Sequence, residues 1–265
     1  MINLCHILLD KAKSVPDKTY IYNSVTEGVS YSKAAARATK LADFLRCNGK
    51  PVLAAIVENA EFLVYLIWAC LAAGICLAFL PKNRHLGQTR LLMNQVGADV
   101  LVTDVPELQA LSLHLPFDAL ETAHFVGREF DTVAPHTPAF IFQTSGTTGE
   151  AKWVAVSKSQ FLAAIQSLWR AGGLNHAIDQ VVYLTPPLFH SYGLSSLLEY
   201  TFVGSTIALP RGISPLGAVG DLREPNFAGN ITAIEAVPYF YAQLSKLSGL
   251  RRGGQPQGIA PTKWL

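Results

Sequence analysis

The chain has 265 residues, of which 50% are hydrophobic and 15% are charged, so it can bury a large core, and long disorder is not expected. Its net charge of +2, without a stripe of basic residues interleaved with aromatics, gives no indication of nucleic acid binding.

The four cysteines form no CxxC pair and lie among apolar residues. This pattern predicts reduced thiols in the core of a cytoplasmic protein, rather than disulfides. The N-terminus also lacks the basic-then-apolar order of a secretory signal.

The first half of the chain alternates between helix and strand patterns. Ser32 is expected to cap a helix with apolar residues at helical spacing, and Asn48-Gly49 is expected to end it. Further elements are predicted, alternately strand and helix, at 52–57, 60–73, 75–80, 86–95 and 99–104. No firm element is predicted between residues 105 and 137.

One apolar run, residues 62–80, has no charge over nineteen positions and so has the length of a membrane span. Gly74 interrupts it, and Glu61 and Pro81 close its ends. A buried helix that stops at Gly74, followed by a buried strand, explains the same residues and is the favoured interpretation. No membrane span is therefore expected.

In the second half, a strand at 138–143 leads into a segment rich in Gly and Thr. Ser157 and Gln160 form an S-x-x-Q capping box for a helix of about 158–171, which ends at Gly172-Gly173. Later elements are predicted at 181–185 (strand), 194–202 (helix), 205–210 (strand), 231–238 (strand) and 239–247 (helix).

This alternation, with strands that are apolar throughout, predicts an α/β fold in which parallel sheets are covered by helices. Residues 1–247 are expected to form one domain. Residues 248–265 are rich in Gly and Pro, show no periodicity, and are expected to form a loop.

The segment FQTSGTTGEAK, residues 142–152, carries the chemistry expected of a phosphate site. Its two glycines allow a ligand to approach the backbone closely, its hydroxyls donate hydrogen bonds, and Lys152 adds a mobile positive charge. It is not a Walker A motif, because Ala151 stands where that motif requires Gly. From the residues alone, an ordinary turn remains the alternative.

The stretch TSGTTGEAKWVAVS closely resembles the phosphate-loop signature of the adenylate-forming enzymes, which include acyl- and aryl-CoA ligases and peptide-synthetase adenylation domains. Ala151 departs from the Pro that is usual there. TPPLFHSYGL, residues 185–194, resembles the substrate-pocket motif of the same family. VSYSKAAARATKLADFLRCNG and LAAGICLAFLP resemble its early segments, so the resemblance covers the chain to about residue 247.

The resemblance implies a fold like the large N-terminal domain of that family and a two-step reaction. A carboxylic acid reacts with ATP to give an acyl-adenylate, and the thiol of CoA or of a carrier-protein phosphopantetheine then takes the acyl group. By matching positions, Lys152 would reach the phosphates, Thr144 would also touch Mg²⁺, and the loop residues would hold the phosphates: Thr144, Ser145, Gly146, Thr147, Thr148 and Gly149.

His190 stands where relatives that activate amino acids usually have Asp, and it cannot supply a permanent negative charge. The resemblance here is to CoA ligases of fatty and aryl acids, whose His lies beside the acyl chain and the adenylate. Ser191, Tyr192 and Gly193 would line the same pocket. The alternatives are a structural loop histidine and a core aromatic.

The family's later motifs for adenine, Mg²⁺, ribose and the catalytic Lys of the lid domain are not found in the chain. We therefore expect that the isolated chain does not catalyse adenylation and that it associates or aggregates. It would be a truncated or degenerate copy that binds nucleotide or acid, or one half of a split enzyme whose remainder is a separate chain. The sequence does not choose among these alternatives.

Overall fold

The computed structural model describes residues 3–23, 28–48, 51–82, 85–112, 134, 136–144, 152–171, 179–212 and 215–247. Within these residues the strands form two sheets of five, with the orders β10-β8-β9-β1-β2 and β5-β3-β4-β6-β7. The strands are β1 (Thr19–Tyr22), β2 (Val29–Ser30), β3 (Val52–Ile56), β4 (Cys76–Phe79), β5 (Val100–Thr103), β6 (Pro138–Thr144), β7 (Lys152–Ser157), β8 (Val181–Leu184), β9 (Thr206–Ala208) and β10 (Ala233–Glu235).

Helices pack on both faces of both sheets. They are η1 (Leu4–His6), α1 (Ile7–Ser14), α2 (Tyr31–Asn48), α3 (Ala60–Ala73), α4 (Leu86–Val96), η2 (Pro106–Leu111), α6 (Lys158–Arg170), α7 (Ser191–Val203), α8 (Pro215–Asp221), α9 (Pro225–Ala228) and α10 (Pro238–Leu247).

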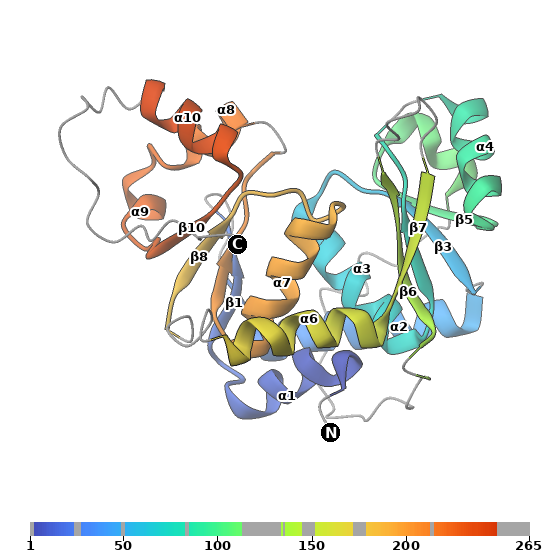
Figure 1. Cartoon of the computed structure of the whole chain (residues 1–265), viewed down its shortest axis with the longest axis horizontal. Coiled ribbons are helices and arrows are strands. Elements are labelled where there is room, and N and C mark those ends of the chain that lie inside the picture. The colour runs from blue at the N-terminus through green and yellow to red at the C-terminus, as the bar shows by residue number, and fades with distance from the viewer. Residues whose placement is uncertain are drawn as a thin grey trace.

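Figure 1 shows α2, α3, α6 and α7 between the two sheets, and they share one large core with the inner sheet faces. The outer face of one sheet is covered by α4, and that of the other by α8, α9 and α10. The expected α/β fold is therefore confirmed, in five layers. Two strand pairs, β1 with β2 and β6 with β7, are antiparallel and the others are parallel.

The apolar run of residues 62–80 folds as predicted, because α3 ends at Gly74 and β4 follows it. Gly74 takes the left-handed conformation, with φ of 73°, which suits a residue without Cβ. Every residue from Phe62 to Ala72 is buried against neighbouring elements. No helix in the described part of the chain has the length and hydropathy needed to cross a membrane.

Two sequence predictions need correction. Ser32 does not cap α2; it lies inside the helix, and the hydroxyl of Ser30 accepts from the amide of Lys33 instead. Cys47 is exposed, whereas Cys5, Cys70 and Cys76 are buried free thiols as expected. The capping box at α6 is confirmed, since the Ser157 hydroxyl and the Gln160 side chain each accept from the other residue's amide, at 3.3 and 2.8 Å.

Candidate functional site

The segment that is predicted to bind phosphates, residues 142–152, begins at the end of β6, beside the ends of two other strands. β6 pairs in parallel with β4, and β4 pairs in parallel with β3, so the carboxyl ends of all three meet at one edge. Thr144 is the last residue of β6 and is exposed at this edge. Ligands of open parallel sheets commonly bind outside the carboxyl ends of the strands.

Thr144 and Lys152 face each other across the antiparallel pair of β6 and β7. The Thr144 hydroxyl donates to the Lys152 carbonyl at 3.2 Å, and the Lys152 side chain is exposed. The other candidate phosphate ligands, Ser145, Gly146, Thr147, Thr148 and Gly149, lie outside the described residues. Of the predicted phosphate site, the two residues that flank the loop are therefore brought together.

The second motif forms the turn before α7 and the start of that helix. The amide of His190 donates to the Pro187 carbonyl at 3.0 Å, and His190 occupies the N-cap position of α7. At Gly193, a Cβ would lie 2.3 Å from the Pro187 oxygen and 2.6 Å from the Pro186 oxygen. Gly193 thus permits the close approach of α7 to the turn before it.

The His190 ring is exposed and lies against Phe189, with ring centroids 4.6 Å apart. Partial desolvation lowers the pKa of His190, which favours the neutral imidazole. A neutral imidazole can donate one hydrogen bond and accept another, but it cannot pair an ammonium group. Ser191 is exposed beside it.

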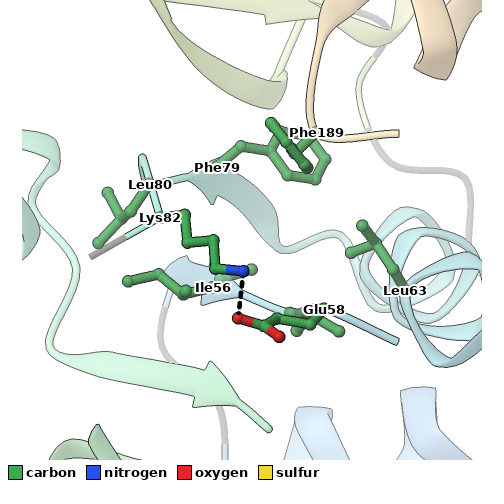
Figure 2. Close-up of a pocket in the computed structure, with 9 residues that line it drawn as sticks. Ile56, Glu58, Leu63, Phe79, Leu80, Lys82 and Phe189 are labelled. Atoms are coloured by element: carbon green, nitrogen blue, oxygen red, sulfur yellow. Dashed lines mark ion pairs between the residues drawn. The ribbon is translucent and has the colours of Figure 1, made fainter. Parts of the chain in front are cut away.

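Phe79, at the end of β4, connects the two motifs. Its ring stacks on Phe142 of β6 at 5.4 Å, and it lines a small cavity together with Phe189. Figure 2 shows the side chains of Phe79 and Phe189 next to each other above that cavity. Because β6 ends at Thr144, two residues beyond Phe142, both motifs lie at the same edge of the sheet.

The same cavity contains charged groups that the sequence analysis did not identify. Lys82 pairs with Glu58 at 2.7 Å, and Ile56, Leu63 and Leu80 supply apolar walls (Figure 2). The carboxylate of Asp104 accepts from the amides of Glu58 and Asn59 and so anchors the turn after β3. With a volume of about 20 Å³, the cavity has room for about one water and not for an organic acid.

Tyr192 takes part in a second group of side chains that the sequence did not predict. Its hydroxyl donates to the carboxylate of Glu235, and the hydroxyl of Tyr200 donates to the other oxygen of that carboxylate at 2.9 Å. Glu199 is buried nearby on α7, and burial together with Glu235 raises its pKa to about 7. The only sequence signal was a carboxylate within two apolar runs, SLLEYTF and ITAIEAVP.

The profile of the AMP-binding enzyme family matches residues 8–259. The chain belongs to this family. It is 25% identical over 248 residues to the 2-succinylbenzoate–CoA ligase of Bacillus subtilis, covering 89% of this chain and 49% of that protein. It is also 30% identical over 175 residues to a plipastatin synthase of the same organism, covering 60% of this chain and 7% of that protein.

Solved structures share the fold of this chain. The o-succinylbenzoate coenzyme A synthetase of Bacillus subtilis in complex with AMP aligns with a TM-score of 0.75 at 22% identity, covering 96% of this chain and 65% of that one. Apo MatB of Rhodopseudomonas palustris aligns with the same TM-score and identity, covering 92% of this chain and 51% of that one. The chain thus spans about half the length of the curated CoA ligases it matches, 44% and 49% for two of them.

Among the described residues, no group of three or more His, Cys, Asp or Glu side chains could hold a metal ion. Mg²⁺ prefers oxygen ligands and usually binds through substrate phosphates with one or two protein oxygens. The Thr144 hydroxyl donates a hydrogen bond to the backbone carbonyl of Lys152. The lone pairs of the Thr144 hydroxyl oxygen can therefore face a hard cation. The residues present therefore fit a magnesium ion that arrives with a polyphosphate.

Proposed function

We propose that the edge formed by the ends of β4 and β6 and by the start of α7 binds ATP and a carboxylic acid. The reaction would join them as an acyl-adenylate. The observation that carries the proposal is that Thr144 and Lys152 face each other at this edge, on either side of a Gly/Thr-rich loop. Phe79 brings the pocket motif to the same edge.

In this reaction a carboxylate oxygen of the acid attacks the α-phosphorus of ATP, and the bond to the β-phosphate oxygen breaks to release pyrophosphate. Negative charge moves onto the leaving oxygens as the bond breaks. Lys152 and the hydroxyls and amides of residues 144–149 would stabilise this charge as positioned donors. Mg²⁺, held by Thr144 and the phosphates, would neutralise part of the same charge.

The acid would lie beside α7, next to His190 and Tyr192. A neutral imidazole suits an acyl chain and the uncharged acyl carbonyl oxygen of the adenylate better than it suits an α-ammonium group. We therefore assign the site to fatty or aryl acids rather than to α-amino acids. The likeness to CoA ligases and to a plipastatin synthase supports activation of a carboxyl group in general.

The second step would transfer the acyl group to a thiol. The sulfur of CoA or of a carrier-protein phosphopantetheine attacks the acyl carbon, and AMP leaves with the electron pair of the broken C–O bond. Since the chain spans about half of its ligase relatives, a segment or partner chain carrying further groups of the site is part of this proposal. A cytoplasmic location, which the buried free thiols favour, belongs to it as well.

Calorimetric titration of the chain with ATP and Mg²⁺ tests the nucleotide part of this proposal. We expect saturable 1:1 binding that is lost when all three phosphates are absent, as in adenosine. Equal affinity for ATP and adenosine would contradict a phosphate site at residues 144–152.

A further inference from the structure

Glu235, the last residue of β10, contacts both ends of the pocket motif, residues 185–194. Its backbone carbonyl accepts from the amide and the hydroxyl of Thr185, at 3.0 and 2.9 Å, where the motif begins. Its carboxylate accepts from the hydroxyl of Tyr192, near the end of the motif. The two contacts therefore hold between them the turn that carries His190.

The second oxygen of the same carboxylate contacts α7 further along the helix. It accepts from the Tyr200 hydroxyl at 2.9 Å, about two helical turns after Tyr192. Two contacts this far apart fix the direction of the helix as well as its position. Since His190 is the N-cap residue of α7, the direction of the helix also determines where the imidazole lies.

The backbone next to Glu235 is held by elements outside the pocket motif. β10 pairs in parallel with β8, and the hydroxyl of Tyr241, on α10, donates to the Ile234 carbonyl at 2.7 Å. The sheet and α10 thus fix the end of β10 independently of the turn before α7. Glu235 can therefore transmit the rigidity of the sheet to that turn.

A carboxylate suits this position because it only accepts hydrogen bonds, and each tyrosine hydroxyl has one proton to donate. Hydrogen bonds to an ionised carboxylate are shorter and stronger than those between neutral groups. Burial, together with Glu235, raises the pKa of both Tyr192 and Tyr200, which keeps the two hydroxyls protonated. Because the hydroxyl proton of Tyr192 is donated to Glu235, the part of Tyr192 left for a bound acid is its aromatic ring.

We propose that Glu235 is a positioning residue of the acid site, which acts on a bound apolar acid by holding the turn that carries His190. The inference rests on the proposed function, because it concerns the acid half of that same site. Glu235 itself would not touch the acid. Loss of its carboxylate should loosen the turn and weaken acid binding, and the nucleotide half at residues 144–152 should be unaffected.

Nuclear magnetic resonance of the His190 imidazole protons tests the positioning without any ligand. The imidazole lies against Phe189, with ring centroids 4.6 Å apart, so the ring current of Phe189 shifts the His190 signals. Signals that disappear in His190→Gln are assigned to His190. In Glu235→Ala we expect them to move toward the positions of a free histidine, while the signals of the other histidines stay in place.

Further variants connect this effect to the hydrogen bonds of the side chain. The amide of Glu235→Gln can accept from one tyrosine and donate to the other, so this variant should restore the His190 signals. Glu107→Ala removes an exposed carboxylate from η2 and is the matched control. Circular dichroism checks the fold of each variant. If Glu235→Ala does not fold, Tyr200→Phe, which removes a single hydroxyl, should shift the same signals and takes its place. Unchanged His190 signals in the folded variant, or equal shifts in Glu235→Ala and Glu235→Gln, overturn the proposal.

Calorimetric titration of the full chain with 3-phenylpropanoate, and separately with ATP and Mg²⁺, distinguishes this inference from the proposed function. We expect Glu235→Ala to bind the acid roughly fivefold more weakly than the wild type, the factor that corresponds to the net value of one hydrogen bond, and to bind ATP equally well. Equal affinity of both proteins for the acid, with ATP binding intact, overturns the inference and leaves the proposed function standing. His190 signals that depend on Glu235 in a chain that binds neither ligand support the positioning and contradict the proposed function.

Discussion

Thr144 and Lys152 are directly opposed across β6 and β7, and the hydroxyl of one donates to the carbonyl of the other at 3.2 Å. This contact holds the end of β6 and the start of β7 at one level of the sheet. The Lys152 side chain, exposed beyond this contact, remains available for a ligand. The pairing of β6 with β7 therefore fixes the backbone of Lys152, the residue that we propose to contact the phosphates.

Replacing Lys152 by Ala should weaken ATP binding about tenfold or more. A charge-assisted hydrogen bond contributes roughly 1.5–3 kcal/mol, and each 1.4 kcal/mol corresponds to a factor of ten in affinity. Calorimetry with ATP and Mg²⁺ measures the difference. Lys40→Ala removes an exposed lysine from α2 and is the matched control. Equal losses in the two variants, or none in Lys152→Ala, would remove Lys152 from the site.

The acid site should reject an α-ammonium group. We expect 3-phenylpropanoate to bind at least tenfold more tightly than phenylalanine, which has the same skeleton with an added ammonium. The physical reason is that the neutral His190 offers no negative charge to a desolvated cation. Titration of both ligands gives the ratio of their dissociation constants. The substitution His190→Asp should bring the two affinities closer together. Tighter binding of phenylalanine by the unchanged chain would contradict the proposal that the site accepts acids without an α-amino group.

The sequence pattern was sufficient to predict an element where burial alone determines its bounds. The helix Ala60–Ala73 and its stop at Gly74 agree with the prediction to the residue, because its apolar run is bounded by Glu61 at the start and by Gly74, which suits the left-handed end. The cap of α2 was missed because Ser30 and Ser32 are both acceptable cap residues. Only tertiary packing decides that Tyr31 is already helical and buried.

Strand β7 was also not predicted, although KWVAVS has the composition of a strand. Its residues are half-exposed or exposed, so the pattern lacks the apolar continuity that marked the buried strands. The Glu199 and Glu235 pair could not be predicted for a different reason. The two residues are 36 positions apart, and only the fold of α7 against β10 brings them near each other.

Gly193→Ala should destabilise the protein by about 1–3 kcal/mol, the usual cost of overpacking. The added methyl group would lie 2.3 Å from the Pro187 oxygen, and a backbone carbonyl cannot move without displacing the turn that holds His190. Chemical denaturation provides the free energy of unfolding. Gly87→Ala in α4 is the control, because its Cβ meets nothing within 4 Å. That variant should be as stable as the wild type or up to about 1 kcal/mol more stable. Similar effects of the two substitutions would contradict the close approach at α7.

Stability should fall as the pH rises from about 4.5 to about 7, and Glu199 should be the cause. Its pKa in the folded protein is raised to about 7 by burial and by Glu235, whereas the ordinary value is 4.5. Between these pH values the folded state binds the proton that the unfolded state has released, so increasing pH favours unfolding. The charged and titratable groups that face Glu199 are Glu235 from β10 and Tyr192 and Tyr200 from α7.

The loss at pH 8 relative to pH 4.5 should be on the order of 3 kcal/mol, since each pKa unit corresponds to about 1.4 kcal/mol. Glu199→Gln cannot ionise and should lack this loss. The free energy of unfolding of Glu199→Gln should therefore increase relative to that of the wild type as the pH rises from 5 to 8. Urea denaturation of both proteins across this range measures the difference, with Glu107→Gln as the matched control. A difference between Glu199→Gln and the wild type that stays constant with pH would mean that Glu199 ionises at its ordinary pKa.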